Sequence, residues 1–152
     1  MADTYTVERS AIINAPAKDI YAQIIDFRNW RAWSPWDKLD PDMTRTYSGA
    51  DSGPGAVYDW SGNRKAGEGR MKITDATEPS DVTITLNFVK PFKSSSTTAF
   101  RLRPAEGATK VTWSMTGPKT MMVKVMSLYK SMDKMVGPDF ENGLQRLAVV
   151  TE

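Results

Sequence analysis

The chain has 152 residues, of which 40% are hydrophobic and 25% charged, and its formal net charge is +2, from 20 basic and 18 acidic residues. This balance argues against a nucleic-acid-binding protein, which needs Lys and Arg clustered on one face. The length suits a single domain over residues 1–152. The sequence contains neither Cys nor His, which excludes disulfides, thiolate nucleophiles and Cys- or His-bound metals. We expect no metal and no other cofactor, and an enzyme of this composition would use Asp, Glu, Lys, Arg, Tyr or water.

A strand followed by a short helix is predicted at the N-terminal end. Residues 4–13 alternate as a strand does, with Val7 and Ile13 on one face. Asn14 can cap a helix, Pro16 suits a helical first turn, and apolar residues then recur at helical spacing as far as Ile25. The sequence begins without a secretory leader, and no run approaches the ~18 apolar residues of a membrane span. We therefore expect a soluble cytoplasmic protein.

Three of the five tryptophans, Trp30, Trp33 and Trp36, fall within seven positions directly after this helix. A buried aromatic ring belongs first of all to a core. Trp30 and Trp33 are therefore predicted to pack against the helix and close one end of a sheet. Trp36 follows the helix-breaking pair Ser34 and Pro35, and we predict that it lies at the rim of a cavity.

Six further strands are predicted, each with one apolar face. They are residues 43–49, 56–62, 70–77, 81–89, 97–104 and 109–117. The pattern is clearest in residues 81–89, where apolar and polar residues alternate without a break as far as Phe88. Strands of this kind form antiparallel sheets with an apolar inner face and a polar outer face.

The apolar spacing becomes helical from Lys119 to about Val150. Pro138 is expected to kink this helix or to begin a new one after Gly137. The apolar face of the sheet has no other large partner. The predicted fold is therefore an α+β fold, in which a curved antiparallel sheet wraps around a long C-terminal helix and a short helical segment follows the first strand.

Several segments resemble the START-like superfamily, also called SRPBCC, in its branch of polyketide cyclases, dehydrases and lipid-transport-like proteins. The segments are Ile-x-Ala-Pro at residues 13–16, the run from Asp26 to Trp36, and residues 66–73, 90–92, 109–117 and 133–144. The resemblance implies the helix-grip fold, a seven-stranded antiparallel sheet around a long C-terminal helix with a cavity between them. Members include carriers, receptors and cyclases, so this fold alone does not define an activity.

The inward-facing residues of the predicted strands and of the last helix are the candidate ligand-binding residues. The chain contains nine methionines, whose flexible side chains either adapt to ligands of variable shape or fill gaps in a core. The predicted lining is Trp36, Tyr58, Trp60, Met71, Phe88, Phe100, Trp113, Met115, Met122, Met126, Tyr129 and Met132. Tyr58, Tyr129 and Arg9 are candidates for orienting a ligand, and no catalytic residue is assigned.

The leading functional prediction is binding or transport of a small hydrophobic or amphipathic molecule, lipid- or polyketide-like, in the cavity between sheet and helix. Removal of apolar area from water would drive binding, at about 25 cal/mol per Å². One alternative is a cyclase or dehydratase acting on polyketide-like substrates in the same cavity; an inward carboxylate or a Tyr–Arg pair would favour it. The other is a stress-response or interaction domain without ligand, favoured by a filled interior. We expect no nucleic acid and no stable membrane insertion, and a homodimer is left open.

Overall fold

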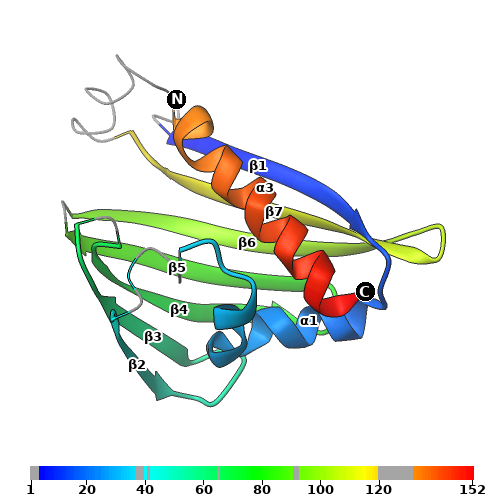
Figure 1. Cartoon of the computed structure of the whole chain (residues 1–152), viewed down its shortest axis with the longest axis horizontal. Coiled ribbons are helices and arrows are strands. Elements are labelled where there is room, and N and C mark those ends of the chain that lie inside the picture. Colours follow the sequence, from blue (N-terminus) through cyan, green and yellow to red (C-terminus); the bar gives the residue numbers. More distant parts are fainter. Residues whose placement is uncertain (1–3, 37–39, 41, 65, 91–92, 120–131) are drawn as a thin grey trace.

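The computed structural model describes residues 4–36, 40, 42–64, 66–90, 93–119 and 132–152 (Figure 1). Its elements are β1 (Thr4–Ile13), α1 (Ala17–Ile25), the 3-10 helix η1 (Phe27–Ala32), β2 (Thr44–Gly49), β3 (Ala56–Ser61), β4 (Glu68–Thr77), β5 (Asp81–Lys90), β6 (Ser94–Ala105), β7 (Ala108–Pro118) and α3 (Met132–Thr151). The described strands form one seven-stranded antiparallel sheet in the order β1-β7-β6-β5-β4-β3-β2. The sheet curves around α3 as the helix-grip prediction requires (Figure 1).

The C-terminal helix differs from its predicted form. α3 passes through the exposed Pro138 without ending, so the alternative in which a new helix begins after Gly137 is wrong. Tertiary contacts on both sides hold the helix together here, because Arg9 packs against Gly137 and Phe140 stacks on the sheet. Lys119 is not helical, and residues 120–131 of the predicted helix lie outside the described residues.

Residues 27–36, which we call the tryptophan segment, follow α1 and supply hydrogen-bond donors to its last turn. The last carbonyls of a helix have no donor within the helix itself. The indole N–H of Trp30 donates to the carbonyl of Ile24 at 2.8 Å, and that of Trp33 donates to the carbonyl of Gln23 at 3.2 Å. Both rings are buried, so the prediction that Trp30 and Trp33 belong to the core is confirmed.

The strand register places the inner-face side chains in rows that cross the sheet. Ile73, Ile84, Thr98, Met115 and Val7 lie opposite one another on successive strands. Val82, Phe100 and Trp113 form the next row toward α1. All eight side chains are buried. We call them the core rows, and they form the closed part of the interior.

A stack of aromatic rings attaches α3 to the core rows. Phe140 of α3 lies parallel to Trp113 of β7, with ring centroids 4.2 Å apart at 7°. Trp113 in turn stacks on Phe100 of β6 at 4.9 Å. Trp36 meets the edge of this stack, 5.6 Å from Trp113 at 89°. The stack therefore links helix, sheet and tryptophan segment.

Replacing Phe140 by Ala tests the contribution of this stack. We expect the free energy of unfolding to fall by about 3–5 kcal/mol, because the ring leaves a cavity between helix and sheet. Urea denaturation measures the change. Val149→Ala is the control on the same helix, since Val149 is 75% exposed and its loss should matter by less than about 0.5 kcal/mol. Equal effects of the two variants would contradict the assigned role of the stack.

Gly143 marks a close approach of α3 to the core. A Cβ atom at this position would lie 2.6 Å from Cζ3 of Trp113 and 3.2 Å from Cδ of Pro35. Gly→Ala in a helix interior ordinarily stabilises by about 1 kcal/mol. Here we expect Gly143→Ala to destabilise by about 1–3 kcal/mol, because neither ring can move aside freely. Thermal unfolding should show the opposite sign to the exposed control Asn142→Ala, and a stabilised Gly143→Ala would refute the close contact.

Candidate functional site

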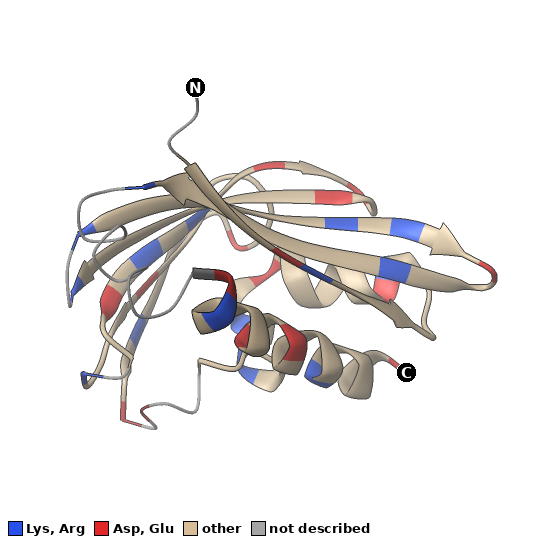
Figure 2. Ribbon diagram, turned by 90° about the horizontal axis from the view of Figure 1, so that it is seen from above, with Lys and Arg blue, Asp and Glu red and all other residues tan. Residues whose placement is uncertain are grey.

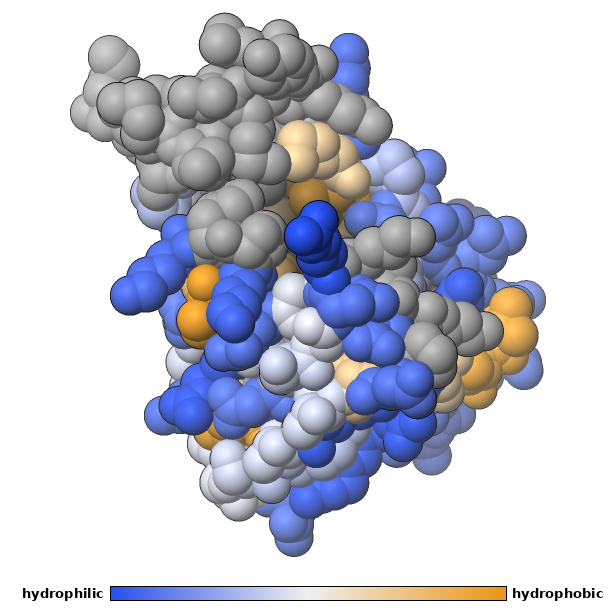
Figure 3. Space-filling model, turned by 60° about the vertical axis from the view of Figure 1, so that its left-hand side comes forward, coloured by the Kyte–Doolittle hydropathy of each residue, from blue (hydrophilic) through white to orange (hydrophobic). Residues whose placement is uncertain are grey.

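Next to the core rows, inner-face side chains at one end of the sheet are only half-buried. We call the following residues the open rows, because they lie opposite one another in two adjacent rows: Tyr47, Tyr58, Met71, Leu86 and Ser96, then Trp60, Gly69 and Phe88. Among their side chains only that of Tyr58 is buried. A recess with apolar surface is visible at this end of the molecule (Figure 3).

The open rows extend beyond the described start of α3. The guanidinium of Arg9 donates to both carboxylate oxygens of Asp133 at 2.8 and 2.9 Å, and its Nε donates to Glu141 at 2.8 Å. These bonds place the first turn of α3 over Arg9. Tyr5, which marks the level of the first open row, lies four residues earlier on β1, or about 13 Å away. The described part of α3, which begins at Met132, therefore does not reach the open rows.

Arg9 anchors the helix to the edge of the sheet. Its guanidinium lies against Gly137, where a Cβ would collide with it. Hydrogen bonds to Asp133 and Glu141 raise the pKa of Arg9, and the bond from Arg9 lowers the pKa of the Asp133 carboxyl. Arg9 is a predicted ligand-orienting residue, but its guanidinium donates hydrogen bonds to side chains of α3 and thereby positions the helix over the sheet.

The Arg9 anchor should make stability depend on pH. Asp133 has a folded-state pKa below its ordinary value of 3.8, so the pair stabilises the fold above that pH, and the stabilisation is lost as pH falls through the lower folded value. We expect Arg9→Met to lower the urea midpoint at pH 7, and the gap to wild type to shrink below pH 3.8. Arg101→Met removes an exposed pair with Glu8 at 3.1 Å and should change little. A gap that stays constant with pH would contradict the role of Asp133.

The predicted lining residues whose side chains the structure describes fall into three groups. Tyr58, Trp60, Met71 and Phe88 come together in the open rows. Trp36 is half-buried at the edge of the ring stack. The third group is buried in the core rows: Phe100, Trp113 and Met115. Met122, Met126 and Tyr129 lie outside the described residues, and so does the side chain of Met132.

Sequence reasoning did not assign four members of the open rows to the site, one of which is Gly69, which has no side chain. Leu86 lies on the same face of β5 as Ile84 and Phe88, so the pattern that predicted Phe88 also predicts Leu86 as a lining residue. Tyr47 lies on the short edge strand β2, whose pattern is weak. Ser96 is polar, and alternation of apolar residues gives no signal for a hydroxyl on an inner face.

A groove of about 390 Å³ lies on the opposite, outer side of β2–β5. Its lining is Thr44, Thr46, Asp59, Trp60, Ser61, Glu68, Gly69, Arg70, Asn87 and Val89. The charged groups of this groove have partners within it: Arg70 donates to Asp59 at 2.7 Å, and Glu68 accepts from the Ser61 hydroxyl at 3.3 Å. The groove therefore offers charged groups that are already paired, beside apolar surface that includes Val89 and part of Trp60, a member of the open rows.

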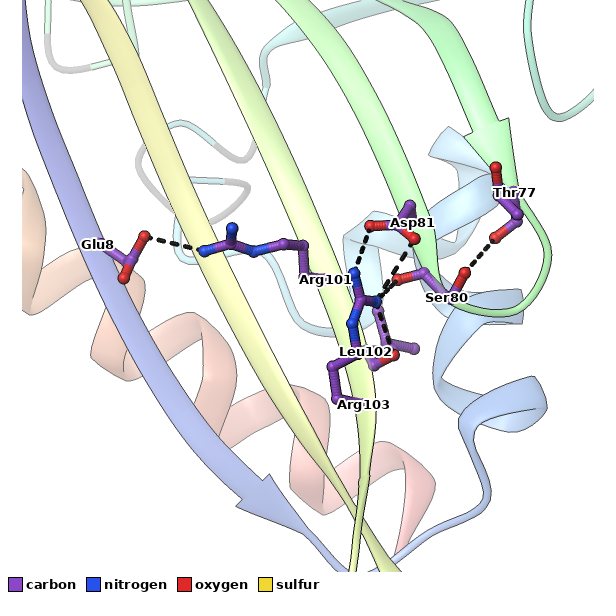
Figure 4. Close-up of polar contacts among 7 residues, drawn as sticks. All are labelled: Glu8, Thr77, Ser80, Asp81, Arg101, Leu102 and Arg103. Atoms are coloured by element: carbon purple, nitrogen blue, oxygen red, sulfur yellow. Dashed lines mark hydrogen bonds and ion pairs between the residues drawn. The ribbon is translucent and has the colours of Figure 1, made fainter.

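Paired charges also cover the outer face farther along the sheet. Arg101 reaches across β7 to Glu8, and Arg103 binds Asp81 and the Ser80 carbonyl (Figure 4). Blue and red positions are interspersed along the described strands and on α3 (Figure 2). No described group of Asp and Glu side chains could hold a metal ion. Within the described part of the chain, no helix is long and apolar enough to cross a membrane.

The curved sheet, the closing helix and the half-open apolar interior define a helix-grip protein of the SRPBCC type. A family model described as "Polyketide cyclase / dehydrase and lipid transport" matches residues 4–152. The chain therefore belongs to this family, as its sequence motifs predict. None of the curated proteins matches the chain.

Solved structures share the fold at low sequence identity. Protein Ms6760 from Mycobacterium smegmatis is 20% identical with a TM-score of 0.67, and the match covers 99% of this chain and 92% of that one. Protein jhp0584 from Helicobacter pylori is 8% identical with a TM-score of 0.71, covering 99% and 89%. Ara h 8.0201 is 14% identical with a TM-score of 0.65, covering 97% of each chain. These likenesses support the helix-grip architecture.

Proposed function

We propose that this protein binds a small hydrophobic or amphipathic molecule on the open rows, at the end of the inner face that the described part of the C-terminal helix does not cover. The observation that carries the proposal is the half-exposure of inner-face apolar side chains such as Met71, Leu86 and Phe88. Burying one such side chain completely contributes about 1.5–3 kcal/mol. A ligand that covers these side chains gains part of this free energy, and family membership supports the same class of ligand.

The aromatic wall of the open rows favours a flat ligand. Trp60 stacks with Tyr58 at 5.9 Å and 18°, and meets Phe88 edge-on at 5.4 Å. The indole N–H of Trp60 donates to the carbonyl of Ala66 at 2.9 Å, which fixes the ring. A Cβ at Gly69 would lie 2.6 Å from the indole, so glycine lets the ring lie flat on β4. A preformed wall of this kind suits polycyclic, polyketide-like molecules better than flexible ones.

A cyclase or dehydratase is the second candidate function. Arg28 lies 5.2 Å above the ring of Tyr47, a Tyr–Arg pair at the margin of the open rows. The cation contacts the ring face, however, which contributes binding energy and not proton transfer. Burial raises the pKa of the Asp139 carboxyl, but Asp139 lies one helical turn before Gly143, on the side of α3 that meets Pro35. Binding without chemistry therefore ranks first.

Filling the open rows with a larger side chain tests the proposal. We expect wild type to bind 1-aminoanthracene with a rise in dye fluorescence. Met71→Trp should weaken that binding at least tenfold, because the new indole occupies the space of the ligand. Lys72→Trp is the matched control, since Lys72 is the exposed neighbour of Met71 on the outer face. Equal binding by both variants, or no binding by folded wild type, would reject the open rows as the site.

A further inference from the structure

Tyr5 lies on the inner face of β1, level with the first open row. It is opposite Gly117 of β7, and its ring rests on that glycine. A Cβ at Gly117 would lie 2.8 Å from the Tyr5 hydroxyl oxygen and 3.0 Å from Cε2 and Cζ. Any side chain at this position would displace the ring, so Gly117 gives Tyr5 the room to reach across β7. The side chain that Tyr5 then meets is Ser96 of β6.

The two hydroxyl groups border an apolar strip. Ser96 lies opposite Leu86, and Leu86 lies opposite Met71, so a line across the sheet passes from two hydroxyls to two apolar side chains. Tyr5 and Ser96 are both half-buried, and each keeps surface that a bound molecule can reach. The strip carries no charged side chain. A ligand that spans this strip would place apolar atoms over Leu86 and Met71, and one edge of the ligand would lie beside the two hydroxyls.

The Tyr5 hydroxyl remains protonated at neutral pH. Burial raises its pKa, and the interaction with Ser96 offsets only part of that effect. A protonated phenol both donates and accepts hydrogen bonds, as does a serine hydroxyl. The pair can therefore bind a hydroxyl or a carbonyl oxygen equally well.

We propose that Tyr5 and Ser96 bind an oxygen atom of the ligand and make the site prefer oxygenated polycyclic molecules over hydrocarbons of the same shape. This inference rests on the proposed binding function and adds a specificity to it. A hydrocarbon lying beside the pair would strip water from both hydroxyls, form no hydrogen bond with either, and leave them only each other as partners. A ligand oxygen restores the bond, and sites built around a hydroxyl contact discriminate against analogues that lack it.

Two probes of one shape test the specificity. Anthracene and 2-hydroxyanthracene differ by a single oxygen, and binding of each is followed by probe fluorescence in wild type, Tyr5→Phe and Ser96→Ala. We expect wild type to prefer the hydroxylated probe about fivefold. Tyr5→Phe should abolish the preference, in part by strengthening anthracene binding because no phenol hydroxyl is left to desolvate, and Ser96→Ala should reduce it. Tyr21→Phe removes a hydroxyl from α1, outside the open rows, and should retain the full preference.

The outcomes separate this inference from the function on which it rests. If folded wild type binds neither probe, the binding function itself is overturned. If wild type binds both probes equally, or if Tyr5→Phe and Ser96→Ala keep the preference, only the role of the hydroxyl pair is overturned. Circular dichroism establishes that each variant folds. Should Tyr5→Phe fail to fold, Ser96→Ala decides alone, because a full preference in that variant contradicts the proposal.

Discussion

One helix cannot cover the inner face of a seven-stranded sheet. Seven strands spaced about 4.8 Å apart span about 30 Å, whereas a helix with its side chains is about 10 Å wide. α3 lies over the β1 and β7 edge, where Arg9 holds it, and α1 with the tryptophan segment covers one end of the remaining surface. Within the part of the chain that the structure describes, the open rows are the part of the inner face that neither covers. The candidate site follows from this mismatch of areas.

The closed part of the interior gives the open part a rigid floor. Trp113 lies amid rings from β6, α3 and the tryptophan segment. Its buried indole N–H finds no hydrogen-bond acceptor among the described residues, which costs about 1–3 kcal/mol. Close packing of the surrounding rings offsets that cost. Because such a core leaves little free volume, a ligand bound over Met71 and Leu86 as proposed would meet a wall at the core rows and would not penetrate farther.

The alternation of apolar and polar residues shows which face of a strand a side chain lies on, but not how deeply that side chain is buried. Phe88 and Phe100 alternate with polar neighbours in the same way, and both were predicted to line the cavity, yet Phe100 is fully buried and Phe88 is not. The difference arises from the register between strands and from the position of α3. The helix is held in that position by the salt bridge between Arg9 and Asp133, which are 124 residues apart in the sequence. Strand and helix periods are local, so the fold was predictable. The division into core rows and open rows depends on distant pairings, and so does the placement of Tyr5 over Gly117.

The pairing of β1 with β7 constrains the order in which the molecule is assembled. Thr4 lies opposite Pro118, so β1 has no partner on this side until β7, more than 90 residues later in the chain, has been translated. Contacts this distant carry a large loop-closure entropy and slow folding. The hairpins from β2 to β7 can associate earlier, whereas the Arg9 anchor forms only after α3 exists. A ligand bound over the open rows would stabilise the finished state alone, and its concentration in the cell would then influence how much of the newly made protein survives.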